Sequence, residues 1–207
     1  MNRKNTKQTR HVLAVSQRIC VTPHEVRDAL AQDWARFLSE VLPDAVWVPV
    51  PNGLSDVTKW FDGFSFTGLI LTGGEDWSVF PHRDSTEGVL FAKAMRDGLP
   101  ILGVCRGMQI INRFLGGTDL HVPDHVAVRH SVMLTTEEVQ KVNSFHARGI
   151  TDNTLAPALL ATALASDGTV EAFEHCTAPV YGMMWHPERE AKPHPNDIKL
   201  FRQFWSQ

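Results

Sequence analysis

The sequence predicts an α/β fold with a mainly parallel central sheet flanked by helices. Short apolar runs alternate with segments of helical periodicity along the chain, which is the pattern of strands joined by crossover helices. The 207 residues are 43% hydrophobic and 21% charged, values typical of one globular domain. No linker or internal repeat is visible. We therefore expect one domain over residues 11–207, preceded by a flexible basic tail at residues 1–10.

The first helix is expected to begin close to Thr22. This threonine can cap a helix, Pro23 suits the first helical position, and Glu25 completes a capping box. Apolar residues then recur at helical spacing as far as Val41, and Pro43 ends the helix.

The other elements follow from short apolar runs and from residues typical of helix ends. Strands are predicted where apolar runs stand between turn signals, at 12–15, 46–50, 68–71, 100–104, 170–173 and 180–184. Further helices are predicted from Asp84 or Ser85 to Gly98, from Met108 to Leu115 and from Asn196 to Trp205. The polar, histidine-rich stretch 120–142 predicts loops or short strands.

Charge and cysteine content exclude several classes of protein. Twenty basic and 23 acidic residues give a net charge of −3, without the basic excess of a nucleic-acid-binding protein. Three widely separated cysteines do not make a disulfide framework and favour a reducing compartment. The chain has neither a membrane-spanning apolar run nor the apolar stretch of a signal peptide. We expect a cytoplasmic protein without nucleic-acid or membrane partners, and a homo-oligomer stays open.

The segment 103–109 carries the sharpest chemical signal. Cys105 stands where an apolar strand ends and a helix begins, with Gly103 two residues before it and Gly107 two after it. This is the layout of a nucleophile elbow, in which larger side chains at the glycines would collide with backbone. The helix N-terminus, chiefly the amide of Arg106, favours a thiolate and can hold an oxyanion. The paired glycines favour a nucleophile over a structural cysteine.

A cysteine nucleophile needs a base, and His186 is the candidate. It follows the predicted strand at 180–184, which places it at the same sheet edge as the cysteine. Glu188 can accept the second ring N–H and fix the tautomer. Spacing alone leaves a surface histidine in a polar loop as an equal alternative. Gly73 and Gly74 end a further strand at this edge, as a second oxyanion donor or as a simple turn.

Three other histidines raise the question of a metal site. His121, His125 and His130 are spaced by four and five residues. No acidic residue or cysteine stands at ligand spacing beside them, and Pro123 interrupts any helix. The sequence therefore predicts no metal and no cofactor.

Three motifs occur together and in one order, LTGG at 71–74, GVCRGMQ at 103–109 and WHPE at 185–188. With them the chain resembles the class I glutamine amidotransferase-like superfamily, which implies a flavodoxin-like three-layer fold. The resemblance implies a catalytic triad of Cys105 as nucleophile, His186 as base and Glu188 as orienting acid. In this family the cysteine attacks a γ-glutamyl carbonyl, an amine leaves, and water releases glutamate from the thioester.

Two segments resemble the γ-glutamyl hydrolase branch, which includes the hydrolase of γ-glutamyl-γ-aminobutyrate. Residues 73–76 lack the Gly-Pro-Gly loop usual in synthetase-linked members, and residues 142–146 are similar to the branch's Val-Asn-Ser-x-His segment. By this match, three residues would contact the glutamyl group and a fourth would face the pocket, namely Gln109, Ser144 and Phe145, and His146. Ala147 replaces the second histidine often found in the branch, which puts contacts with the leaving amine in doubt.

Three further segments stand in this short chain, SQR at 16–18, VRDALAQDW at 26–34 and MWHPER at 184–189. With them it looks most similar to the short members found in capsule and surface-sugar gene clusters. One of these hydrolyses γ-glutamyl-CDP-amidate during phosphoramidate modification of the capsule. A nucleotide leaving group would need cationic contacts, for which the candidates are Arg18, Arg83, Arg106 and Arg148. The resemblance thus implies a small-molecule γ-glutamyl amide as substrate. The rival functions are a glutaminase subunit that supplies ammonia to a synthetase partner, and a non-catalytic amidotransferase-like binding protein.

Overall fold

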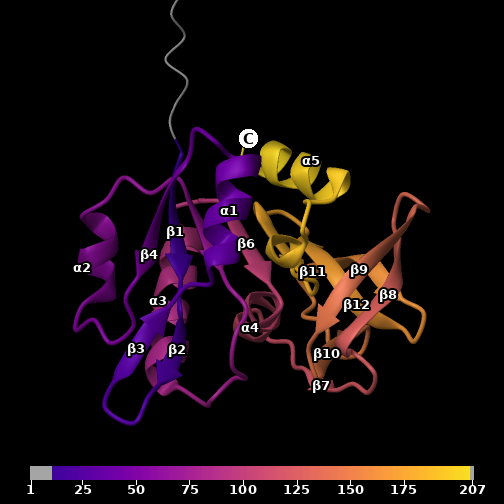
Figure 1. Ribbon diagram of the computed structural model, residues 1–207, viewed down its shortest axis with the longest axis horizontal. Helices are drawn as coiled ribbons and strands as arrows, with labels where there is room; N and C mark the ends of the chain where they lie inside the picture. Colours follow the sequence, from indigo (N-terminus) through magenta and orange to yellow (C-terminus); the bar gives the residue numbers. More distant parts are fainter. Residues whose placement is uncertain (1–10, 206–207) are drawn as a thin grey trace, which may run out of the picture.

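A computed structural model describes residues 11–205, and the basic tail predicted at residues 1–10 lies outside the described residues. The middle of the molecule is a set of five neighbouring parallel strands, in the spatial order β4 (Val46–Val50), β1 (Val12–Ser16), β5 (Gly68–Leu71), β6 (Ile101–Val104) and β13 (Val180–Met183) (Figure 1). Each of these strands coincides with an apolar run that predicts a strand from sequence.

Antiparallel strands extend the sheet beyond β13. They are β12 (Thr169–His175), β11 (Leu159–Ala165), β8 (Val126–Leu134) and β9 (Val139–Phe145), with β10 (Arg148–Thr151) and β7 (Leu120–His121) at the side. The strands β8 and β9 form one long hairpin where the sequence predicts loops or short strands. Most residues of β8 are not buried, and Arg129, His130 and Ser131 interrupt its apolar residues, so no continuous apolar run marks the strand. The sequence analysis also missed β10 and β11.

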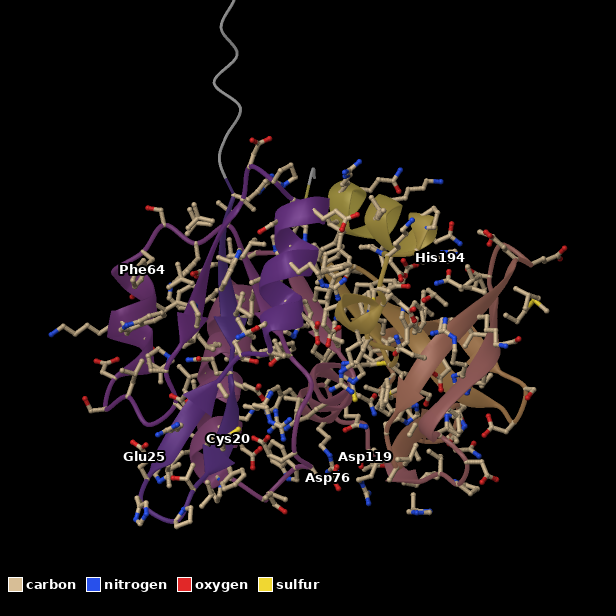
Figure 2. All side chains as sticks on the ribbon, viewed as in Figure 1. Cys20, Glu25, Phe64, Asp76, Asp119 and His194 are labelled. Atoms are coloured by element: carbon tan, nitrogen blue, oxygen red, sulfur yellow. The ribbon has the colours of Figure 1, made fainter. Side chains whose placement is uncertain are left out.

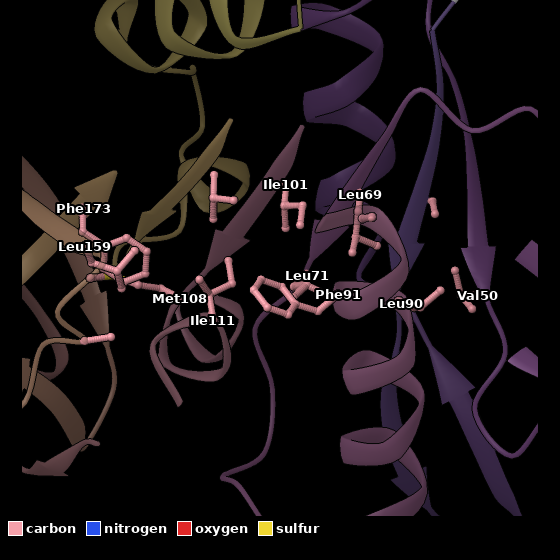
Figure 3. Packing of buried hydrophobic residues seen from close by; sticks show 14 of the residues in the cluster. Val50, Leu69, Leu71, Leu90, Phe91, Ile101, Met108, Ile111, Leu159 and Phe173 are labelled. Carbon is pink, nitrogen blue, oxygen red and sulfur yellow. The ribbon is translucent and has the colours of Figure 1, made fainter. Parts of the chain in front are cut away.

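Helices cover both faces of the parallel strands, so the predicted fold class is confirmed. They are α1 (Gln32–Val41), α2 (Val57–Asp62), α3 (Pro81–Arg96), α4 (Arg106–Phe114) and α5 (Pro195–Phe204). On one face, Leu90 of α3 and Met108 of α4 pack with Leu69 of β5 (Figure 3). On the other, Phe37 of α1 stacks edge to face on Phe201 of α5, with ring centroids 4.8 Å apart. Apolar area buried on both faces explains why these strands read as continuous apolar runs.

The helix start predicted at Thr22 is wrong. Residues 22–25 form the turn of a hairpin between β2 (Arg18–Val21) and β3 (Val26–Ala29), and α1 begins only at Gln32. The Glu25 amide does donate to the Thr22 hydroxyl over 3.2 Å, and that hydroxyl donates to the Glu25 carbonyl. The same short-range hydrogen bonds that cap a helix can therefore also close a hairpin turn, and local sequence does not distinguish the two.

Two further helix boundaries differ from the prediction. Helix α3 begins at Pro81 rather than at Asp84 or Ser85, since a proline suits the first helical position. Helix α4 begins at Arg106, two residues before the predicted start, immediately after Cys105. The six-residue α2 was not predicted, because so short a helix carries little periodicity. No helix in residues 11–205 is long and apolar enough to cross a membrane.

Helix α5 is tied to the sheet by a buried carboxyl group whose ionisation costs stability. The Asp197 side chain accepts hydrogen bonds from the Trp185 indole, at 3.2 Å, and from the Gln140 amide, at 3.4 Å. Burial raises the pKa of Asp197 to about 6, although these hydrogen bonds oppose the shift. Because the folded-state pKa lies above the unfolded value, stability from this group is present below about pH 4 and is lost as pH rises through 6.

The Asp197→Asn variant is therefore expected to be more stable than the unchanged protein at pH 8, by up to about 3 kcal/mol. The amide oxygen still accepts both hydrogen bonds, while the buried charge is removed. The gain should shrink as the pH falls below 6, which urea unfolding at pH 5 and pH 8 measures. Asp152→Asn, in an exposed turn, is the control and should change stability little at either pH. An equal effect of Asp197→Asn at both pH values would contradict the prediction.

Candidate active site

The predicted cysteine stands on a sharp turn between β6 and α4. Its backbone angles are φ 52° and ψ −109°, a strained conformation for a residue other than glycine. The Cys105 amide donates to the Met183 carbonyl of the neighbouring strand, and its carbonyl accepts from the Gln109 amide within the helix. The turn therefore holds the sulfur at the N-terminus of α4, where helical amides lack intrahelical acceptors.

The two flanking glycines are required by close backbone contacts. A Cβ atom on Gly103 would approach the carbonyl group of Gly107 to 2.6 Å, and one on Gly107 would overlap the Leu71 carbonyl. Both approaches are shorter than real Cβ contacts, so the backbone would have to move. This confirms the expectation that larger side chains at these positions collide with backbone. The elbow is thus fixed by packing between α4, β6 and β5.

The parallel pairing of β13 with β6 brings His186 to Cys105. Met183 pairs with Val104 in register, so the residues that follow the two strands emerge at one sheet edge. Burial alone would lower the pKa of His186, but the charge and hydrogen bond of Cys105 and the neighbouring Glu188 together raise it to about 9. The His186 Nδ1 atom lies 2.7 Å from a Glu188 carboxylate oxygen. The imidazole therefore lies between influences of the cysteine and the carboxylate, and all three residues are buried.

Backbone contacts fix the segment that carries the imidazole. The Asn143 side chain of β9 donates to the His186 carbonyl over 2.8 Å and accepts from the His186 amide over 2.9 Å. Arg36 of α1 donates to the Glu188 carbonyl over 2.9 Å. Sequence reasoning missed Asn143 and Arg36 as positioning residues, because both come from elements distant in the chain and act on backbone atoms.

The glycine pair after β5 lies against the imidazole and a buried arginine. A Cβ on Gly73 would approach His186 Cε1 to 2.6 Å, and one on Gly74 would overlap the Arg83 guanidinium. The structure therefore places both glycines at the same edge as Cys105, as the chain order of the strands predicts. The absence of side chains lets this loop approach the site closely. The amides of Gly74 and Arg106 stay the predicted oxyanion donors.

Residues 36–206 match the family model described as glutamine amidotransferase class-I. The chain belongs to this amidotransferase family. It is 29% identical to the γ-glutamyl-CDP-amidate hydrolase of Campylobacter jejuni, over 94% of this chain and 97% of that one. It is 32% identical to the carbamoyl phosphate synthase small chain of a Synechococcus strain, over 56% of this chain and 30% of that one. These relatives support an enzyme that hydrolyses an amide.

The fold agrees with the same family. A Thermoplasma acidophilum protein described as a candidate GMP synthase subunit superposes with a TM-score of 0.70 at 22% identity. The match covers 95% of this chain and 93% of that one. At such low identity the likeness concerns the fold alone, and it confirms the α/β architecture that the sequence predicts.

A buried network of ion pairs holds the side chain of Arg106, the residue that follows Cys105. The guanidinium of Arg106, the first residue of α4, binds the carboxylate of Asp84 at 2.6 Å and also contacts Glu87. Glu87 in turn binds Arg83 at 3.0 Å, which reaches Glu75 of the glycine loop at 3.0 Å. The two arginines are buried and paired, so the structure corrects their candidacy as contacts for a charged leaving group.

The Arg106→Met variant is expected to lose about 3–5 kcal/mol of stability, because two buried carboxylates lose a partner. Urea unfolding should show a lower midpoint with an unchanged slope. Arg27→Gln, which removes an exposed ion pair with Glu25 in the β2–β3 hairpin, is the matched control and should change the midpoint little. Equal effects of the two substitutions would contradict a structural role for the network.

The four residues that the family resemblance assigns to the substrate differ in their exposure to solvent. Phe145 is exposed and its ring packs edge to face on His186, with centroids 5.9 Å apart. The side-chain amide of Gln109 donates to the Arg148 carbonyl over 2.8 Å, and the Ser144 hydroxyl donates to the His125 carbonyl over 2.6 Å. The side chain of His146 is buried and bonds within the protein. Contacts of these four residues with the glutamyl group stay predictions.

The other two arginine candidates, Arg148 and Arg18, are both partly exposed to solvent. Arg148 pairs with the carboxylate of Asp119, which is labelled in Figure 2, and donates to the Asp119 carbonyl over 2.8 Å. Arg18 of β2 is about half exposed and lies 3.8 Å from Glu75. Together with Gly73, His186 and Arg189, Arg18 lines a small pocket beside the predicted catalytic residues. Arg18 is thus the candidate that the tertiary structure leaves at the site.

Proposed function

We propose that the protein hydrolyses a γ-glutamyl amide to glutamate and a free amine. The Cys105 sulfur attacks the γ-carbonyl carbon and forms a tetrahedral intermediate, whose oxyanion accepts from the amides of Gly74 and Arg106. The C–N bond then breaks, and the amine leaves with a proton from His186. Water attacks the resulting thioester, His186 takes its proton, and the thiol is restored as glutamate leaves. Glu188 holds the imidazole in one tautomer and orientation.

One observation carries this proposal. A cysteine on a strained strand-to-helix turn lies close enough to a histidine to raise its pKa, and the ring of that histidine is within hydrogen-bond distance of a carboxylate. A purely structural cysteine requires neither the positive φ angle nor the ion-pairing histidine. The raised pKa of His186 means that the ring is protonated at neutral pH, ready to stabilise a thiolate and to protonate a leaving amine.

As the substrate we propose a γ-glutamyl group attached to a nucleotide phosphoramidate of the CDP-amidate type. The end-to-end similarity to the Campylobacter hydrolase supports this choice. Two partly exposed cations at the site, Arg18 and Arg189, suit the anionic phosphates of such a leaving group. The Arg189 guanidinium also lies over the Phe145 ring, 4.6 Å from its centroid, which holds it beside His186.

The rival function is a glutaminase subunit, which the similarity to the carbamoyl phosphate synthase small chain favours. The test is to incubate the purified protein with glutamine, an alkyl γ-glutamyl amide and a γ-glutamyl nucleotide phosphoramidate, and to assay free glutamate. Fastest release from the nucleotide supports the proposal. Turnover of glutamine alone, enhanced by a partner protein, would replace it by the rival, and no turnover at all would leave a non-catalytic binding protein.

Separate substitutions test the proposed contacts between arginines and the phosphates of the leaving group. Replacing Arg18 or Arg189 by Gln is expected to raise KM for the nucleotide substrate about tenfold while leaving KM for the alkyl amide unchanged. The exposed Arg27→Gln substitution on β3 is the control. Equal effects on both substrates would contradict a phosphate contact without affecting the hydrolase proposal.

A further inference from the structure

Outside the catalytic residues, three histidines converge on one buried glutamate. Glu171 of β12 is fully buried, and the imidazoles of His125, His130 and His146 approach its carboxylate from the β8–β9 hairpin region. The sequence argument against a metal relied on the lack of an acidic ligand near His125 and His130 in the chain. The sheet supplies this ligand, because β12, β11 and β8 are consecutive neighbours. His121 is exposed on β7 and is not one of the converging residues.

Three distances within this cluster match the edges of a metal coordination tetrahedron. His125 Nδ1 lies 3.3 Å from His146 Nε2 and 3.4 Å from Glu171 Oε1, and the third edge, between His146 Nε2 and Glu171 Oε1, is 3.6 Å. Zinc bonds of about 2.0–2.1 Å in tetrahedral geometry separate ligand atoms by about 3.3–3.4 Å. His130 Nε2 adds a fourth donor 3.3 Å from Glu171 Oε2. Single ligand atoms of His125, His130 and Glu171 also lie within 4.8 Å of one another.

In two of the imidazoles, the ring nitrogen that faces away from the cluster is bonded to an acceptor. The ring nitrogen that faces the cluster can therefore carry the lone pair. His146 Nδ1 lies 2.9 Å from the Arg148 carbonyl oxygen, which can only accept, so this nitrogen carries the hydrogen. The His125 Nε2 atom lies 2.9 Å from an Asp167 carboxylate oxygen, which likewise accepts. In neutral rings, His146 Nε2 and His125 Nδ1 are then free to ligate. Metal-bound histidines characteristically donate their other N–H to a carboxylate or a carbonyl in this way.

Without an ion, only protonated histidines can balance the charge of Glu171, and this neighbouring carboxylate raises the pKa of His125 to about 9. Both carboxylate oxygens of Glu171 and the Nε2 atom of His130 are buried without a hydrogen-bond partner in the part of the chain that the structure describes. A buried carboxylate facing imidazole lone pairs is costly unless a cation lies between them. A divalent ion bound between them would supply that cation.

We propose that His125, His130, His146 and Glu171 bind one divalent transition-metal ion of the zinc class in a closed structural site. Imidazole and carboxylate donors suit such ions, and the burial of the ligands leaves little room for a substrate. The ion joins β12 to both strands of the β8–β9 hairpin, at its open end. That hairpin carries Asn143, which holds the backbone of His186, so the metal stabilises the scaffold of the active site.

The experiment measures bound zinc in protein that carries Cys105→Ala, since a catalytic thiolate can also bind zinc. After equilibration with zinc and desalting, about one zinc per chain is expected, with a melting temperature about 5–10 °C above that of the chelator-treated protein. Adding Glu171→Gln or His125→Asn should reduce retained zinc at least tenfold and abolish the thermal shift. The matched control, His121→Asn, should retain the metal.

A second measurement does not depend on any substitution in the cluster. Titration of the Cys105→Ala protein with Co²⁺ is expected to give the visible absorption of a tetrahedral nitrogen and oxygen site, with an endpoint at one equivalent. If no metal is retained, if Glu171→Gln binds as much zinc as the parent, or if stability responds to pH and not to zinc, the cluster is neutralised by protons and the proposal is overturned. None of these readouts depends on glutamate release, so a failure here is distinct from a failure of the proposed reaction.

Discussion

The Cys105→Ala variant is expected to release glutamate from the preferred γ-glutamyl amide about 10⁵–10⁶-fold more slowly than the unchanged protein. The substitution removes the only protein atom that forms a covalent bond to the substrate in the proposed reaction, and the helix amides and the pocket then contribute little alone. The measurement is kcat from a continuous glutamate assay under saturating substrate. A single-turnover experiment with the unchanged protein should in addition trap a glutamyl thioester, which the variant cannot form.

The control for this substitution is Cys20→Ala, on β2 of the hairpin, which should leave kcat unchanged (Figure 2). Circular dichroism and urea unfolding of Cys105→Ala should resemble those of the parent, since the side chain is small and the glycine contacts of the elbow are kept. Retained turnover in a folded Cys105→Ala protein would remove the proposed mechanism.

The His186→Asn variant is expected to lower kcat by about 10⁴-fold or more. The substitution removes the group that protonates the leaving amine and activates water, and it leaves Cys105 without its cationic partner. A mechanism in which these two residues act as a unit predicts strong non-additivity. The double variant Cys105→Ala, His186→Asn should therefore be no slower than Cys105→Ala alone.

The Glu188→Gln variant provides the comparison for the histidine. It keeps an oxygen that can face His186 Nδ1 but removes the charge, so its loss in kcat is expected to be smaller than that of His186→Asn. If His186→Asn loses less activity than Glu188→Gln, or if the losses of the cysteine and histidine variants simply multiply, a different residue acts as the acid and base.

The parallel strands and the elbow were predictable because each depends on a local pattern. Buried parallel strands are continuous apolar runs, and the order of the motifs places Gly73, Cys105 and His186 after three such runs. The carboxyl ends of neighbouring parallel strands share one edge, so chain position alone indicates that these residues meet. The errors arose where the local pattern has two solutions, as at Thr22, or where a strand such as β8 faces solvent and polar residues interrupt its apolar ones.

From its residues alone, the chain reveals which atoms are available for chemistry and the sheet edge at which they gather, since strand polarity and tight glycine turns are short-range properties. Long-range pairing settles the rest. Burial pairs Arg83 and Arg106 with carboxylates instead of a ligand, and β9 brings Asn143 to the backbone of His186. Strand β12 places Glu171 among histidines that have no acidic partner at ligand spacing in the chain. Such contacts join residues far apart in sequence, and no periodicity within one segment records them.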